Sequence, residues 1–244
     1  MLQSFAPAAF SPPPLHFTEE EHGSWAAIGA LHRERRGAQM VPMFLRGLHV
    51  LGLDTQRIPS LDEVNTKLNF LTGWRGVYAK GLEKGPAFFK MLRDRKYPIA
   101  QFVRAPSELG HTPNSDVVHG LYGHLPFLAN EEYADYCQRF GELACQFLDD
   151  STRLRQLERY FWFTTEMGLV QTSEGLRILG AGIASSVSEC TWALSGKPEV
   201  LPFDVEQICE QEFRTDQLQP RLFLLDAVEQ LYMEFPKLEA FIRG

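Results

Sequence analysis

Two histidines and two glycines share the short segment HGLYGH, residues 119–124. Histidine is the commonest metal ligand, so two imidazoles this close suit a metal site. On a regular helix, however, five residues turn by about 500°, which leaves the two side chains about 140° apart. A shared ion therefore requires Gly120 or Gly123 to relax the turn, or His119 to stand at the helix start. The competing interpretation is two partly buried histidines that hydrogen-bond to backbone carbonyls.

A carboxylate in an apolar segment offers a third ligand. Glu166 lies in the aromatic run RYFWFTTEMGL, where a buried acid is costly unless it is paired or bound to a metal. Two histidines and one carboxylate leave open coordination positions and define the non-haem iron(II) oxygenases. Trp162, one helical turn earlier, would point into the same space. The alternative pairs Glu166 with a nearby arginine, either Arg153 or Arg177.

The composition limits the classes of function. The chain has 244 residues, of which 44% are hydrophobic and 23% charged, values typical of soluble globular domains. Its net charge of −7 argues against a nucleic-acid partner, which would require a basic surface. The four cysteines form no CxxC pair, and no stretch reaches 18 uncharged apolar residues. The start resembles no signal peptide, so we expect a cytoplasmic protein without a membrane span.

The elements that must position these residues are mostly helices. Apolar periodicity and capping signals, such as Thr18 with Glu21 and Ser186 with Glu189, predict a short helix after Ser60 and longer ones over 19–36, 41–51, 86–95, 116–124, 131–148, 154–170, 186–194 and 221–235. Short strands are predicted over 74–79, 99–104 and 176–179. The pattern shows no repeat and no internal linker. It therefore predicts one mainly α domain with small β elements.

Several ordered segments resemble a known family. HGLYGH, FVRAPSELGHTPNSD, FWFTTEMGL and LGAGIASSVSE resemble the pterin-dependent aromatic amino acid hydroxylases, above all the short bacterial phenylalanine hydroxylases. LTGWRGVYAKGL, RKYPIAQFVR and TDQLQPRLFLLDAVEQL extend the resemblance over about 16–231. It implies an N-terminal arm over 1–15 and a single catalytic domain over 16–244. The regulatory domain and tetramerising tail of the animal enzymes have no counterpart, which implies a monomer.

The resemblance also implies the chemistry. In the family, the two motif histidines and the glutamate hold iron(II), which here means His119, His124 and Glu166. The implied reaction uses O2 and a tetrahydropterin to hydroxylate the ring of an aromatic amino acid, with phenylalanine as the default. Two alternatives remain open. One is a related iron enzyme that oxidises a different aromatic substrate in a specialised pathway, and the other is a non-catalytic binding protein.

The resemblance places the amino acid substrate among Arg104, Thr112, Pro113, Asp116, Trp162 and Ser185. Arg104 would bind its carboxylate, because a planar guanidinium suits a two-point contact. Asp116 would help to hold Arg104, and an ion pair of these two alone is the structural alternative. Trp162 would form an aromatic wall or simply belong to the core. Ser185 would orient the first histidine.

The pterin side of the resemblance is less complete. Phe88 matches the ring that stacks on the pterin, and Gly81 with Leu82 matches the loop that contacts its edge. Gly120 stands where the family has an acid near the pterin, so its presence puts pterin affinity in doubt. An acid restored at this position should raise that affinity or the coupling of O2 use to hydroxylation. Other departures from the family pattern are His111, Tyr122 and Met167.

Overall fold

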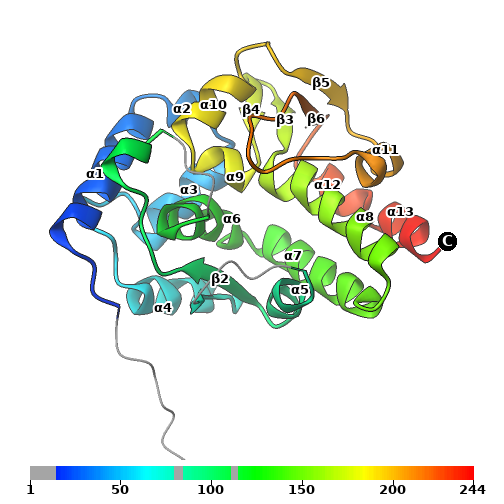
Figure 1. Cartoon of the computed structure of the whole chain (residues 1–244), viewed down its shortest axis with the longest axis horizontal. Helices are drawn as coiled ribbons and strands as arrows, with labels where there is room; N and C mark the ends of the chain where they lie inside the picture. The colour runs from blue at the N-terminus through cyan, green and yellow to red at the C-terminus, as the bar shows by residue number, and fades with distance from the viewer. Residues whose placement is uncertain (1–14, 80–84, 111–114) are drawn as a thin grey trace, which may run out of the picture.

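Helices build most of the molecule, as Figure 1 shows. The computed structural model describes residues 15–79, 85–110 and 115–244. The α-helices are α1 (Glu19–Arg33), α2 (Arg36–Gln39), α3 (Pro42–Leu51), α4 (Leu61–Thr72), α5 (Pro86–Arg93), α6 (Leu125–Leu128), α7 (Glu131–Ala144), α8 (Ser151–Phe161), α9 (Ala181–Ala184), α10 (Val187–Ala193), α11 (Val205–Glu210), α12 (Gln230–Met233) and α13 (Phe235–Arg243). Short 3-10 turns are η1 (Pro106–Glu108) and η3 (Cys145–Phe147). Two further segments, η2 (Val118–His124) and η4 (Trp162–Glu166), are π-helices.

Two small sheets complete the fold. Strands β1 (Arg75–Ala79) and β2 (Lys96–Ala100) form a parallel pair. A second sheet has the order β4-β3-β6-β5, with β3 (Leu169–Thr172), β4 (Gly175–Ile178), β5 (Glu199–Pro202) and β6 (Arg221–Leu225). In this sheet β3 and β4 form an antiparallel hairpin, whereas β6 runs parallel to both of its neighbours. The two sheets lie toward opposite edges of the view in Figure 1.

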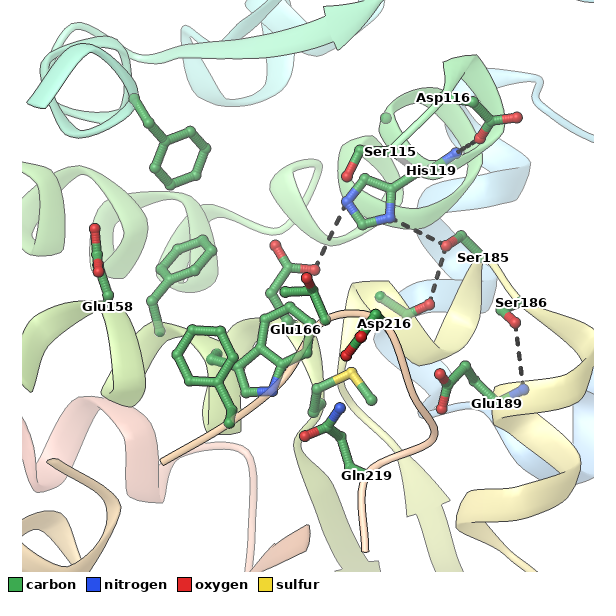
Figure 2. A pocket seen from close by; sticks show the side chains of 18 of the residues that line it. Ser115, Asp116, His119, Glu158, Glu166, Ser185, Ser186, Glu189, Asp216 and Gln219 are labelled. Carbon is green, nitrogen blue, oxygen red and sulfur yellow. Dashed lines mark hydrogen bonds and ion pairs between the residues drawn. The ribbon is translucent and has the colours of Figure 1, made fainter. Parts of the chain in front are cut away.

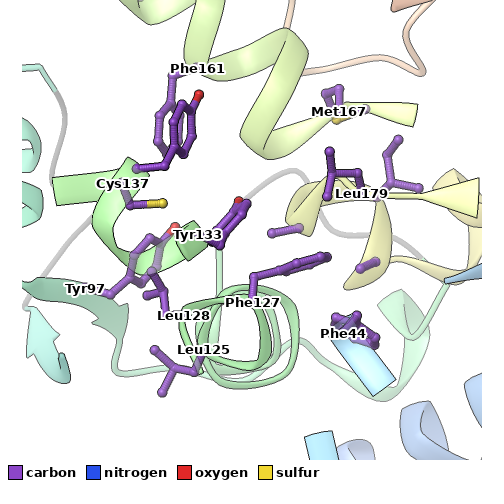
Figure 3. Packing of buried hydrophobic residues seen from close by; sticks show 14 of the residues in the cluster. Phe44, Tyr97, Leu125, Phe127, Leu128, Tyr133, Cys137, Phe161, Met167 and Leu179 are labelled. Atoms are coloured by element: carbon purple, nitrogen blue, oxygen red, sulfur yellow. The ribbon is translucent and has the colours of Figure 1, made fainter. Parts of the chain in front are cut away.

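The helix that follows the histidine motif is fixed by the aromatic core (Figure 3). Phe127 of α6 packs against Phe44 of α3 and Tyr133 of α7, with ring centroids 5.1 and 5.4 Å apart. All three are buried, and burial of each such ring contributes about 1.5–3 kcal/mol or more. A Cβ on Gly47 would lie 1.9 Å from the carbonyl oxygen of Pro126, so only glycine lets α3 approach α6 this closely. The core thus holds η2 in place through α6.

The predicted helix over 221–235 is wrong in its first part. Residues 221–225 form strand β6, which lies between β3 and β5 in the larger sheet, and α12 and α13 follow it. The run Leu222-Phe223-Leu224-Leu225 is apolar without a break, a pattern shared by a buried helix and a strand covered on both faces. Leu222, Phe223 and Leu225 are buried, and the backbone of the segment pairs with β3 on one side and β5 on the other.

Other boundaries also differ from prediction. The helix predicted over 154–170 ends as α8 and η4, and residues from Leu169 onward join β3. The helix over 19–36 divides into α1 and α2, and the strand predicted over 99–104 begins at Lys96 and ends at Ala100. Arg95, between α5 and β2, has a φ of 53°, a left-handed conformation that neither a regular helix nor a strand adopts, and β2 begins directly after it. The capping box of Thr18 with Glu21 is confirmed.

Candidate metal centre and substrate pocket

The π-helical turn of η2 removes the geometric objection to the histidine pair. In a π-helix each hydrogen bond joins residues five apart, so side chains at that spacing come onto one side of the helix. The amide of Leu125, directly after η2, donates such a bond to the carbonyl of Gly120. The Nε2 atoms of His119 and His124 consequently lie 3.1 Å apart. The relaxed turn that the sequence required is present.

Glu166 completes the cluster from a second π-helical turn. The amide of Met167 donates to the carbonyl of Trp162, five residues earlier, at 2.9 Å. This turn brings the Glu166 carboxylate to 3.2 Å from Nε2 of His124 and 3.7 Å from Nε2 of His119. One donor atom from each residue lies within 4.8 Å of the others.

The arginines proposed as alternative partners of Glu166 are engaged elsewhere. Arg153 pairs with Asp150, and Arg177 pairs with Glu174. The interpretation in which an arginine neutralises Glu166 is therefore wrong. The partners of the buried carboxylate are the two imidazoles.

The protonation states of the cluster suit a divalent ion. Burial lowers the pKa of His119 to about 4, so its imidazole is neutral near pH 7. Burial opposes ionisation of Glu166, but the adjacent imidazoles of His124 and His119 hold its pKa below the usual value. Two imidazoles and a carboxylate are the donor set of the facial triad that binds non-haem iron. The residues present thus fit an iron ion.

Ser185 sets the orientation of the first imidazole. Its hydroxyl donates to the carbonyl of Gly182 at 3.0 Å and lies 3.2 Å from Nδ1 of His119. Because the single hydroxyl proton is already used, the serine oxygen accepts a bond from Nδ1–H. Nε2 of His119 therefore carries the lone pair that faces Glu166 and His124. Such a partner fixes the tautomer and the orientation of the ring.

Strand β2 supports the metal cluster from the side. Alternate side chains of a strand share one face, and here Tyr97 and Ile99 face η2. The Tyr97 ring stacks on His124 with centroids 4.2 Å apart, and Ile99 packs against Gly120. Sequence analysis did not single out Tyr97 or Ile99, because nothing local in RKYPIAQ indicates which element the strand will cover.

Arg104 is held rigidly by Asp116, and both are buried. Nε and Nη2 of the guanidinium donate to the two carboxylate oxygens at 3.0 and 2.8 Å, and Nη1 donates to the carbonyl of Ser185 at 3.0 Å. Asp116 also accepts from the amide of His119 at 2.9 Å, which ties the arginine to the metal segment. Each Nη atom of Arg104 has a second N–H, so the guanidinium still offers two hydrogen-bond donors to a ligand. Arg104 lines the pocket, so ion pairing and ligand binding are compatible.

A cavity of about 680 Å³ connects these groups, a size suited to small organic ligands. Figure 2 shows Asp116, Ser185 and Glu189 on one side, Glu158 on the opposite side, and His119 with Glu166 between them. Of the predicted site residues, Phe88, Arg104, Asp116, His119, Gly120, Trp162, Glu166 and Ser185 line the cavity. His124 is buried beneath it. Gly81, Leu82, Thr112 and Pro113, with His111, lie outside the described residues.

The aromatic wall has one member that sequence analysis missed. Trp162 stacks on Phe213 with centroids 4.6 Å apart and an interplanar angle of 11°. Phe213 belongs to the segment 211–220, which follows α11 and lines the cavity with several further residues. A single aromatic in the polar stretch QEFRTDQLQ was the available signal.

Helix α5 carries two adjacent phenylalanines. Phe89 is buried in the core, whereas Phe88 is only half-buried beside the cavity.

Gly120 fits tightly against strand β2. A Cβ at this position would lie 3.0 and 3.1 Å from the two γ carbons of Ile99. We therefore expect Gly120→Asp to destabilise the fold by about 1–3 kcal/mol through overpacking. Ile99→Ala opens the space but creates a cavity of its own, so the double variant should be more stable than the sum of the single effects predicts. Denaturant unfolding of the four proteins measures this coupling, and strictly additive effects would contradict the contact.

Comparison with known proteins agrees with this site. Residues 10–243 match the family model of the biopterin-dependent aromatic amino acid hydroxylases. The phenylalanine-4-hydroxylase of Ralstonia nicotianae is 36% identical over 90% of this chain and 70% of its own length. That of Pseudomonas aeruginosa is 34% identical over 89% of this chain and 82% of its own.

Solved structures show the same fold. Phenylalanine hydroxylase from Chromobacterium violaceum with bound Fe(III) aligns with a TM-score of 0.88 at 32% identity, over 99% of this chain and 90% of that one. The cobalt-bound form of the same enzyme gives a TM-score of 0.87 at 31% identity, over 99% and 89%.

The chain belongs to the biopterin-dependent aromatic amino acid hydroxylases. The predicted family, the mainly α fold and the monooxygenase class are thereby confirmed.

In the described ranges, no helix combines the length and apolar character that crossing a membrane requires.

Proposed function

We propose that this protein hydroxylates the ring of phenylalanine, using O2, a reduced pterin and an iron ion held by His119, His124 and Glu166. The observation that carries the proposal is the three-donor cluster, of which His119 and Glu166 line a cavity with different groups on its two sides. Asp116, which pairs with the buried Arg104, lies on one side of the cavity, and Glu158 lies on the other, beside the start of the helix that carries Phe88 (Figure 2). Such a cavity suits two organic molecules on either side of a metal.

At the Arg104 end, the guanidinium binds the carboxylate of the amino acid substrate. Asp116 and the carbonyl of Ser185 hold the guanidinium in one orientation, so little side-chain entropy is lost when the substrate binds. The amino acid ring then extends toward the metal along Trp162. The stacked pair of Trp162 and Phe213 forms an apolar wall that excludes water from the reacting ring. Thr112 and Pro113 are part of the proposed substrate site through the family resemblance.

At the Phe88 end, the cofactor binds against aromatic side chains. Phe88 meets Phe161 edge to face with centroids 5.2 Å apart, and both line the cavity. A flat heterocycle gains stacking energy from such rings. Gly81 and Leu82 belong to this end by resemblance. When bound, iron supplies the site for O2 activation with electrons from the pterin, and the protein holds the substrate ring toward it.

One assay tests the proposal. The protein is loaded with iron(II), given tetrahydropterin and O2, and offered phenylalanine, tyrosine or tryptophan with detection by mass spectrometry. We expect phenylalanine to gain one oxygen atom. Iron binding without product from any of the three would favour the second candidate, oxidation of another aromatic substrate. The departures from the family pattern at Gly120 and Met167, which both line the cavity, support this candidate. Failure to bind iron would contradict both.

The proposal also covers the state of the protein in the cell. We propose a monomer with one catalytic domain over 16–244, working in the cytoplasm without a nucleic-acid partner. The net charge of −7 supports the last point, because it disfavours contact with a phosphate backbone. Size-exclusion chromatography with light scattering measures the oligomeric state directly.

A further inference from the structure

The Phe88 end of the cavity holds a carboxylate that the proposed chemistry has not used. Glu158 lies in α8, three residues before Phe161, so both side chains share one face of that helix. An ideal Cβ on Gly85 would lie 3.8 Å from Oε1 of Glu158, which places the carboxylate beside the start of α5. Phe88 follows in the first turn of α5. Figure 2 shows Glu158 across the cavity from Ser185 and Glu189.

This arrangement combines an aromatic surface with a hydrogen-bond acceptor. Phe88 and Phe161 meet at an interplanar angle of 80°, and both line the cavity together with Glu158. A reduced pterin is a flat heterocycle with N–H donors on its pyrimidine ring and, in biopterin, hydroxyl donors on its side chain. Aromatic rings recognise its face, and an ionised carboxylate forms strong hydrogen bonds with its donors.

The wall beside the metal cannot serve as that acceptor. Gly120 has no side chain, and Ile99 occupies the space where one would begin. Asp116 is bound to Arg104, and the carboxylate of Glu166 lies against the imidazoles. Asp216 pairs with Arg214 at 2.6 Å. Glu189 lies on the opposite side of the cavity from Glu158, the side on which Ser185 and Asp116 also lie (Figure 2).

Glu158 retains acceptor capacity for a ligand. Its contact with Arg155 is long, at 3.4 Å, and that arginine is held more closely by Glu212 at 3.1 Å. The Arg155 guanidinium also lies over the Phe213 ring, 4.9 Å from its centroid. A carboxylate accepts about four hydrogen bonds, so one long contact leaves most of that capacity available. Glu158 is about one-third exposed, so a ligand in the cavity can reach it.

We infer that Glu158 is the carboxylate that binds the hydrogen-bond donors of the reduced pterin, in place of an acid at Gly120. Glu158 is thus a specificity-determining residue for the cofactor. The inference rests on the proposed function, because it assumes that a pterin occupies the Phe88 end. It explains how a family member can bind the cofactor although glycine follows its first metal-ligating histidine.

A binding measurement tests this role apart from catalysis. Titration calorimetry of the iron-loaded protein with 7,8-dihydrobiopterin gives the dissociation constant for wild type and for Glu158→Gln, which keeps the shape and loses the charge. We expect the variant to bind about 10- to 100-fold more weakly, the effect of losing a charged hydrogen-bond partner. Glu212→Gln is the matched control, because Glu212 also pairs with Arg155 but does not line the cavity. Its dissociation constant should stay within about twofold of wild type.

A second pterin identifies the donors. The second ligand is 6-methyl-7,8-dihydropterin, which lacks the hydroxylated side chain. If Glu158→Gln weakens its binding as much as it weakens the binding of dihydrobiopterin, Glu158 contacts the pyrimidine ring. Weakening confined to dihydrobiopterin assigns it to the side-chain hydroxyls, and either result supports the inference. Unchanged affinity of Glu158→Gln and of Glu158→Ala for both pterins, with wild-type unfolding temperatures, would overturn it. If wild type itself binds no pterin, the proposed function fails instead.

Discussion

Glu166→Gln should lose iron and hydroxylation together, while the protein stays folded. Glutamine fills the same space but carries no charge, and it leaves His119 and His124 as a two-nitrogen site. Loss of an outer partner of a metal ligand already costs about 10- to 100-fold in affinity or activity, so loss of a ligand itself should exceed about 100-fold. Iron content after dialysis and product formation by mass spectrometry measure the two effects.

The control for this change is another glutamate to glutamine substitution. Glu174→Gln removes an exposed acid that pairs with Arg177 in the turn between β3 and β4. It should bind iron as wild type does. Full iron content and normal turnover in Glu166→Gln would show that the cluster is not the metal site. Loss of iron in both variants would instead point to a general loss of structure.

Arg104→Met should damage both the fold and substrate binding, and a second change separates the two effects. Removal of the guanidinium leaves Asp116 as an unpaired buried charge, which costs about 3–5 kcal/mol of unfolding free energy. Adding Asp116→Asn removes that charge and keeps an oxygen that can accept from the His119 amide. The double variant should therefore regain most of the stability.

Substrate binding should not recover in the double variant. Without Arg104 the amino acid carboxylate loses a charged, two-point partner, and we expect KM for phenylalanine to rise by more than about tenfold in both proteins. Denaturant unfolding measures the change in stability, and steady-state kinetics measure the change in KM. A normal KM in the double variant would mean that Arg104 serves only the fold.

The metal ligands could be predicted from sequence because their chemical types are unusual where they stand. Closely spaced histidines and an acid in an aromatic helix suit metal binding, and the family resemblance favoured that role over hydrogen bonding and ion pairing alone. Their geometry could not be predicted. The i→i+5 hydrogen bond that brings His119 and His124 together depends on packing of α6 and β2 against η2, and helical periodicity alone assumes a regular turn.

Some residues of the cavity could likewise be predicted from the sequence, and others could not. Arg104 and Asp116 were predicted as a pair because the resemblance covers both, and the structure confirms their contact. Phe213 and Glu158 were missed, since a loop after α11 and a mid-helix glutamate carry no local signal of a shared cavity. The strand error at 221–225 has a similar cause. An unbroken apolar run does not reveal whether it is buried by helices or by neighbouring strands.

The two π-helical turns make this centre sensitive to the number of residues in each turn. Each turn holds about one residue more than a turn of regular α-helix, and each carries or ends at a metal-ligating side chain. Loss of one residue between His119 and His124 would restore the regular turn, on which side chains four apart lie only about 40° from each other, so the pair would stay on one face. One added residue would instead set the two side chains about 120° apart on a regular helix. A single insertion there would therefore separate the two imidazoles without changing either of them.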